Sequence, residues 1–225
     1  MKRASLLVVA LIVICTSWFA ERLVSQDKAG RKPSPQRDTP SGEDRAASEK
    51  AQTQAELDMQ AVMKKWKEIR EPGRHHTALE PLIGRWKYKQ KIWVQPGSPP
   101  DETTGSTEVR WVMGKRFVQV ESTGKMFDLP YNSMWLIGFD NFKKKYVSCY
   151  LDNVGTGIYP AEGSAGPGKN AITLIGHMDD WYTAEHDRAF AYVIRLGEKD
   201  QWSLEMTDLA SGAKAMEIVY SRARE

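Results

Sequence analysis

Apolar residues beyond residue 55 follow a helical spacing first and an alternating spacing afterwards. One set recurs every three or four residues, as on a single helix face: Met59, Val62, Met63, Trp66 and Ile69. Pro72-Gly73 ends this pattern, and a short helical turn is expected over residues 77–82. The pattern predicts an amphipathic helix that leads into the main body of the protein.

From Arg85 onward the period of the apolar residues changes to two. In the first such stretch, residues expected to face inward alternate with basic residues expected to face water, namely Trp86, Tyr88, Gln90 and Ile92 against Lys87, Lys89 and Lys91. Strands are predicted at 85–94, 107–113, 117–122, 133–139, 146–151, 157–161, 171–176, 188–196, 202–208 and 213–221. Turn-forming residues separate them, without helical patterns between. The expected fold is all-β, an antiparallel up-and-down β-barrel of about ten strands, with a two-sheet sandwich as the alternative.

The first residues carry a membrane-directing pattern. Lys2 and Arg3 precede an uncharged apolar run over residues 4–20, a length that suits either a signal peptide or a short membrane anchor. We expect residues 1–24 to be one of these two, with the membrane as a partner if the segment is not cleaved. The basic residues would stay in the cytoplasm, so the rest of the protein is expected outside it, in the periplasm or cell envelope, either secreted or tethered.

Residues 25–54 have the composition of a linker. They are rich in Ser, Pro, Gly, Gln and mixed charges, and no aromatic residue occurs between Phe19 and Trp66. Such a segment cannot bury enough apolar surface to offset its chain entropy, so it is predicted to be disordered. The remaining residues, 55–225, are expected to form one domain of helix and barrel.

Charge and cysteine content narrow the function classes. The net charge is +3, but residues 66–225 contain 21 basic and 21 acidic side chains, so the predicted domain is formally neutral. A nucleic-acid-binding domain would need surplus Lys and Arg to replace phosphate counterions, so this class is not expected. The two cysteines, Cys15 and Cys149, lie in very different contexts and do not suggest a disulfide.

Five motifs follow one another in a characteristic order along the chain: His76–Trp86, Trp111–Phe117, Gly138–Tyr146, Asp152–Gly157 and Met216–Arg222. Together they resemble a bacterial family catalogued as domain of unknown function 1579, over about residues 60–224. This chain has Met113-Gly114-Lys115-Arg116 where a Gly-Gly pair usually precedes the Arg. The resemblance implies a calycin-like β-barrel, of the general kind used by lipocalins and fatty-acid-binding proteins, and it implies no activity.

Gly84 and Trp86 are similar to the Gly-x-Trp signature of lipocalins. The glycine allows a tight turn into the first strand, and the tryptophan would plug the closed end of the barrel. In lipocalins a basic residue late in the last strand often stacks on this tryptophan. Arg222 is the matching residue, so we expect it to lie over Trp86 in a cation–π contact of about 1 kcal/mol. These three residues are assigned structural roles.

The aromatic residues on the predicted strands give the best indication of function. A barrel of about ten strands is wider than its own side chains can fill, so an internal cavity is expected. Its predicted lining, and hence the predicted ligand site, is Tyr88, Gln90, Trp111, Trp135, Tyr150 and Tyr192. The expected ligand is a small apolar or amphipathic molecule. No catalytic residue is predicted, an enzyme is not favoured, and the sequence identifies no cofactor.

Two alternatives remain open. In the first, the barrel is filled and its outer face, for example the lysine stripe at 87–91, contacts a partner in the cell envelope. In the second, His177 or His186 serves a metal- or haem-dependent enzyme, with His177, Asp179 and His186 as metal ligands. His75-His76 are assigned a structural role, since adjacent side chains on a helix diverge. Asp152-Asn153 is interpreted as a turn, or else as a polar rim of the barrel mouth.

Overall fold

The computed structural model describes residues 42–168, 170–180, 183–197 and 200–224. A long helix, α1 (Gly42–Arg70), is followed by a short helix α2 (Arg74–Thr77) and a 3₁₀ turn η2 (Glu80–Leu82). The strands are β1 (Gly84–Ile92), β2 (Asp101–Val112), β3 (Phe117–Met126), β4 (Leu129–Asp140), β5 (Lys145–Asp152), β6 (Tyr159–Ala165), β7 (Ala171–Asp180), β8 (Glu185–Leu196), β9 (Gln201–Asp208) and β10 (Lys214–Arg222).

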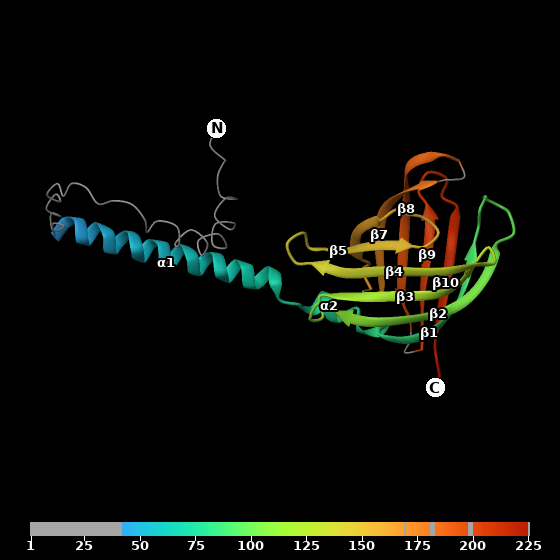
Figure 1. Cartoon of the computed structure of the whole chain (residues 1–225), viewed down its shortest axis with the longest axis horizontal. Coiled ribbons are helices and arrows are strands. Elements are labelled where there is room, and N and C mark those ends of the chain that lie inside the picture. The colour runs from blue at the N-terminus through green and yellow to red at the C-terminus, as the bar shows by residue number, and fades with distance from the viewer. Residues whose placement is uncertain (1–41, 169, 181–182, 198–199, 225) are drawn as a thin grey trace, which may run out of the picture. The chain divides into compact units, whose positions relative to one another are not determined.

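The ten strands form one closed antiparallel barrel in which each strand pairs with its sequence neighbours. The first and last strands pair as well, with Trp86 opposite Arg222 and Tyr88 opposite Tyr220. Figure 1 shows β1–β4 crossing the view and β8–β10 running steeply to them, as strands in a curved wall do. The predicted up-and-down barrel is confirmed, and the two-sheet alternative is wrong.

Alternation along β1 explains why the wall has an apolar inside. Trp86, Tyr88 and Gln90 are buried, whereas the lysines between them are exposed. The same period of two places one face of each strand in the interior, because successive side chains of a strand point to opposite sides. Most predicted strands fall on observed ones, but β2 begins at Asp101 and β4 at Leu129, several residues before the predicted starts. The β2 extension is polar or small and shows no apolar alternation, whereas Pro130 interrupts the strand pattern at the start of β4.

One end of the barrel is closed by the segment that precedes it. Leu79 and Leu82, from the α2–η2 region, are fully buried, and the indole N–H of Trp86 donates to the Leu82 carbonyl at 2.8 Å. The guanidinium carbon of Arg222 lies 4.2 Å from the Trp86 ring centroid, so the predicted cation–π contact is confirmed. Gly84 has φ +133°, and a Cβ there would lie 2.6 Å from Nη1 of Arg222. The glycine is therefore required by both its backbone and its neighbour.

The histidine pair fixes this plug to the barrel wall. His76 is 4% exposed, and its Nδ1 accepts from the Gly73 amide at 3.0 Å. His75 stacks on Phe139 of β4 with ring centroids 4.2 Å apart, and the Tyr146 hydroxyl donates to the His75 carbonyl. Both histidines thus have the structural surroundings predicted for them.

Helix α1 differs from the prediction at its start and in its packing. It begins at Gly42, so residues 42–54, which were assigned to a disordered linker, are helical; Ala, Glu, Lys and Gln in this stretch favour a helix even without an apolar face. The predicted apolar stripe forms, but its residues remain between 44% and 61% exposed. Asn141 bonds the Ile69 and Glu71 carbonyls at the end of the helix. The predicted leader, 1–24, and the first part of the linker lie outside the described residues.

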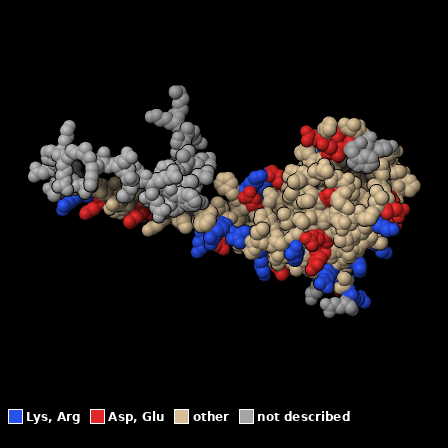
Figure 2. Space-filling view, viewed as in Figure 1, with Lys and Arg blue, Asp and Glu red and all other residues tan. Residues whose placement is uncertain are grey.

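Charges of both signs are spread over the visible face of the barrel (Figure 2). Lys91 pairs with Glu102 and Arg110 with Glu121 across neighbouring strands. Within the described ranges, no helix combines the length and the apolar character that crossing a bilayer requires.

Candidate functional site

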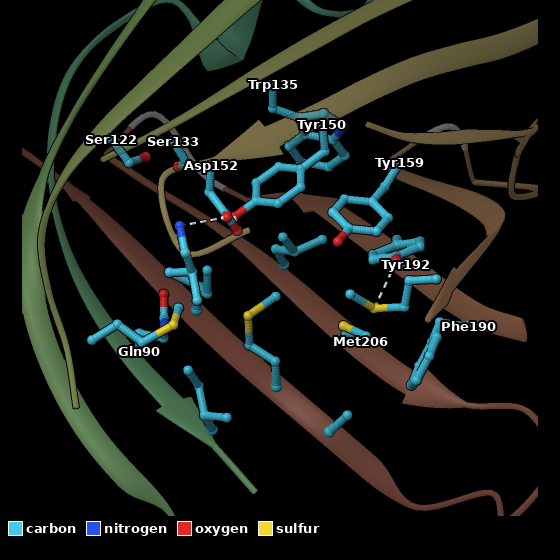
Figure 3. A pocket seen from close by; sticks show the side chains of 18 of the residues that line it. Gln90, Ser122, Ser133, Trp135, Tyr150, Asp152, Tyr159, Phe190, Tyr192 and Met206 are labelled. Carbon is cyan, nitrogen blue, oxygen red and sulfur yellow. Dashed lines mark hydrogen bonds between the residues drawn. The ribbon is translucent and has the colours of Figure 1, made fainter. Parts of the chain in front are cut away.

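The barrel encloses a cavity of about 580 Å³ above the plugged end. Its wall is mostly aromatic and aliphatic, and includes four methionines: Met126, Met178, Met206 and Met216. Figure 3 shows Trp135, Tyr150, Tyr159, Tyr192 and Phe190 directed into this space from strands β4 to β8. This volume is in the range of small-molecule sites in proteins. The filled barrel of the first alternative is therefore not what the chain forms.

Five of the six predicted ligand residues line the cavity: Tyr88, Gln90, Trp135, Tyr150 and Tyr192. Trp111 does not. It lies near the end of β2 at the plugged side of the barrel, where its indole N–H donates to Glu80 at 2.8 Å. Its assignment to the ligand site is corrected to a role in fixing the plug. Strand alternation indicates the inward face, but it does not say how far along the barrel a residue lies.

The sequence did not single out a chain of hydrogen bonds on the cavity wall. The hydroxyl of Tyr150 donates to Oδ2 of Asp152 at 2.9 Å, and the hydroxyls of Tyr131 and Tyr150 are in close contact. Because the Tyr150 proton is engaged with the carboxylate, Tyr131 must donate to the Tyr150 oxygen. Tyr131 on β4 and Tyr150 on β5 are neighbours in the wall, so adjacent strands position the chain of bonds. The chain of hydrogen bonds therefore runs from the Tyr131 phenol through the Tyr150 phenol to the Asp152 carboxylate.

Asp152 is held by the turn that follows β5. Its Oδ1 accepts from the amides of Val154 at 2.9 Å and Gly155 at 3.1 Å, as in an Asx turn. All three residues line the cavity, and Figure 3 shows Asp152 beside Tyr150. Both interpretations of this segment therefore hold, since it is a turn and also part of the cavity rim.

The tyrosines of the cavity are kept neutral by their surroundings. Burial raises the pKa of Tyr88 and of Tyr192 to about 12. Burial also raises the pKa of Tyr131, of Tyr150 and of Tyr220, and the nearby Asp152 carboxylate adds to the rise at the first two. These phenols are therefore hydrogen-bond donors near neutral pH and not phenolates.

Two buried polar atoms on the wall have no hydrogen-bond partner among the described residues. They are Nε2 of Gln90, whose side chain is 3% exposed, and the hydroxyl of Tyr88. An unpaired buried donor is costly, and natural proteins retain few of them. Both residues line the cavity, so a bound molecule could supply the missing acceptor.

The charged residues at the cavity are all acidic. Asp152, Asp179 and Asp180 line it, and no Lys, Arg or His does so within the described part of the chain. Asp180 is paired with Arg188, which also contacts Asp208 and Glu185. Asp179 lies 3.3 Å from Nδ1 of His186. Asp152 has no ion pair within the described ranges.

The predicted metal site does not assemble. The described residues contain no group of three His, Cys, Asp or Glu side chains that could hold a metal ion. His177 is exposed on β7 opposite Ala189, whereas His186 lies three residues before Ala189, about 10 Å further along the ladder. His177 also does not line the cavity, so it cannot serve a haem bound there. Only the Asp179–His186 contact of the proposed triad is formed.

Chemically, the site is suited to hold a molecule. It offers an apolar volume, aromatic faces, neutral phenol donors and the Asp152 carboxylate, which has no ion pair among the described residues. Tyr131, Tyr159 and the four methionines line the cavity as well but were not among the predicted ligand residues. The inward parity of the predicted strands could have indicated Tyr159, Met206 and Met216, whereas the other three lie outside those strands.

Similarity to a solved structure agrees with this fold. The crystal structure of Rv2717c from M. tuberculosis is similar at a TM-score of 0.50 and 17% identity, covering 68% of this chain and 100% of that one. An S-type phycobiliprotein lyase, CPES, from Guillardia theta gives a TM-score of 0.41 and 10% identity, covering 68% and 99%. No curated protein is recognisably similar in sequence. Residues 71–222 match the family described as protein of unknown function (DUF1579), and the chain therefore belongs to that family.

Proposed function

We propose that the protein is a binding protein that holds a small amphipathic molecule inside its barrel. The observation that carries this proposal is the cavity of about 580 Å³ with an apolar, aromatic wall and two unpaired buried donors. Burial of the apolar part of the ligand would supply most of the affinity, at about 25 cal/mol per Å². Gln90 and Tyr88 would set its orientation by donating to an acceptor on the ligand.

The proposal is tested by filling the cavity. Ser148 on β5 lines the cavity, whereas Cys149 next to it points to the outer face of the same strand. Ser148→Phe should abolish binding of phenylnaphthylamine, a neutral apolar probe whose fluorescence rises on burial. Cys149→Phe adds the same ring outside the barrel and should leave binding unchanged.

Intrinsic tryptophan emission offers a second readout, because Trp135 lines the cavity. Thermal unfolding of both variants checks that they are folded. Equal binding by the two phenylalanine variants, or no binding by the parent protein, would reject a ligand-holding barrel. Native mass spectrometry of protein purified from its own cell envelope would then show whether a natural ligand accompanies it.

We also propose that the barrel acts outside the cytoplasm. The support is the sequence alone: Lys2 and Arg3 followed by the apolar run over residues 4–20. Fractionation of cells that produce the full chain, with the N-terminus identified by mass spectrometry, tests this location. Recovery of the intact chain in the cytoplasmic fraction would contradict it.

A further inference from the structure

We propose that the ligand carries a positively charged head group, an amine or quaternary ammonium, which binds beside Asp152, with its apolar tail in the barrel. This inference rests on the proposed binding function and names the class of ligand. Its basis is the charge of the cavity wall, the arrangement of aromatic rings near Asp152, and the bonding of the carboxylate itself.

Charge complementarity favours a cation. The wall contains carboxylates, and within the described part of the chain it contains no basic side chain. Two basic residues on strands that form the cavity wall are engaged with carboxylates outside the Asp152 site: Arg188 with Asp180, Glu185 and Asp208, and Lys214 with Glu205 and Glu217. An anionic head at Asp152 would meet like charge in a partly desolvated site, and a cation would meet the opposite one.

Aromatic faces adjoin the carboxylate. The rings of Tyr150 and Tyr159 have centroids 6.3 Å apart at 34°, and Figure 3 shows Trp135 beside them on the same side of the cavity. Tyr150 bonds Asp152 directly. A cation within about 6 Å of such ring faces is attracted by their quadrupoles, most strongly where water is excluded. An ammonium group can therefore contact Asp152 and several ring faces together.

Asp152 is fixed in place without being neutralised. Its donors are two backbone amides and the Tyr150 hydroxyl, all of them uncharged groups. These bonds orient the carboxylate at the rim and leave its negative charge without a counterion in the described structure. A positively charged ligand head is the group that completes this arrangement.

The test uses three probes with the same decyl chain and different heads: decyltrimethylammonium, decanol and decanoate. Binding to the full chain is measured by isothermal titration calorimetry at pH 7, below the micelle-forming concentrations. We expect the ammonium to bind about tenfold more tightly than the alcohol, and decanoate to bind most weakly.

Asp152→Asn isolates the role of the charge. The asparagine Oδ1 can still accept from the Val154 and Gly155 amides, so the turn should be retained. Its affinity for the ammonium should fall to that of the alcohol, while its affinity for the alcohol stays unchanged. Asp140→Asn is the matched control, because Asp140 likewise accepts from two backbone amides, those of Phe142 and Lys143, but does not line the cavity; it should change neither affinity.

The outcomes separate the two proposals. If none of the three probes binds, the binding function itself fails. If decanol binds as tightly as the ammonium, if decanoate binds most tightly, or if Asp152→Asn leaves the preference intact, then the barrel binds ligands but the cationic head group is wrong.

Discussion

The phenol of Tyr88 lies so close to Gly124 that a Cβ on this glycine would be 2.3 Å from the tyrosine hydroxyl. Gly105 is directly opposite Tyr88 in the ladder, and Gly124 is directly opposite Gly105. The aromatic ring therefore extends from β1 across the inner surface of β2 and β3. Both glycines are needed because the ring occupies the space of the missing side chains.

This contact predicts that Tyr88→Phe restores part of the stability lost when Gly124 is replaced, but not the stability lost when Gly105 is replaced. Gly124→Ala should lower the free energy of unfolding by about 1–3 kcal/mol through overpacking. The loss should shrink in a Tyr88→Phe background, because the nearest atom, the hydroxyl oxygen, is then absent. Tyr88→Phe alone should cost little, since this hydroxyl has no partner among the described residues. Urea unfolding measures all three.

Gly105→Ala is the control for that experiment. A Cβ at Gly105 would lie 2.3 Å from the backbone oxygen of Thr123, which removal of the phenol hydroxyl does not relieve. Its destabilisation should persist in the Tyr88→Phe background. An equal rescue of both glycine variants would contradict the proposed contact.

The contact of Arg222 with Trp86 predicts that removing the positive charge of Arg222 lowers the free energy of unfolding. Arg222→Met keeps the length of the side chain but removes the cation over the ring and the hydrogen bond to the Ile83 carbonyl. We expect a loss of about 1–2 kcal/mol in the free energy of unfolding. Arg195→Met, at a 52% exposed arginine on β8, should change stability by less than about 0.5 kcal/mol. Similar losses for the two variants would assign Arg222 no special role.

The buried His76 predicts a loss of stability in mild acid. Desolvation lowers its pKa from the ordinary value of 6.5 in the folded protein. The unfolded chain therefore binds the proton more readily, and the folded state loses stability as the pH falls from about 6.5 through the lowered folded-state pKa. His76→Gln, which can still accept at the Gly73 amide, should flatten this dependence. Urea midpoints between pH 8 and pH 4 provide the measurement; an unchanged slope in the variant would exclude His76 as its source.

The buried tyrosines predict a second loss at alkaline pH. Because burial raises the pKa of Tyr88 and Tyr192 to about 12, the unfolded chain releases these protons first. Stability should therefore decline as the pH rises above about 10, the ordinary tyrosine value. Absorbance of phenolate at alkaline pH should show these tyrosines ionising late, or together with unfolding. Full ionisation of all tyrosines near pH 10 in the folded protein would contradict their burial.

The number and order of the strands were accessible from the sequence because each strand has one apolar face. Where that face is polar or small, the pattern disappears: Thr103 and Gly105 lie within β2 but carry no apolar signal. The same limitation applies to α1, whose first turns have helix-favouring residues and no apolar stripe. Alternation detects the burial of side chains, so segments that pair through the backbone alone escape it.

Only part of the candidate site could be predicted, because strand alternation shows which side chains face inward but not how deep in the barrel they lie. Alternation assigns Trp111 and Tyr150 to the interior alike, yet one lies beside the plug and the other beside the rim. Depth along the barrel depends on strand register and tilt, which only the closed ladder fixes. The bond from Tyr150 to Asp152 was likewise hidden, because it requires the turn after β5 to bring the carboxylate back toward the cavity.

Because β1 pairs with β10, the barrel cannot close before both of these strands have been synthesised. Until the last residues of β10 leave the ribosome, β1 and β9 each present an unpaired edge, and the wall cannot be sealed. Contacts between segments so distant in sequence also slow folding. A nascent chain therefore keeps two open sheet edges until β10 has been synthesised, and the cavity cannot be enclosed before that point.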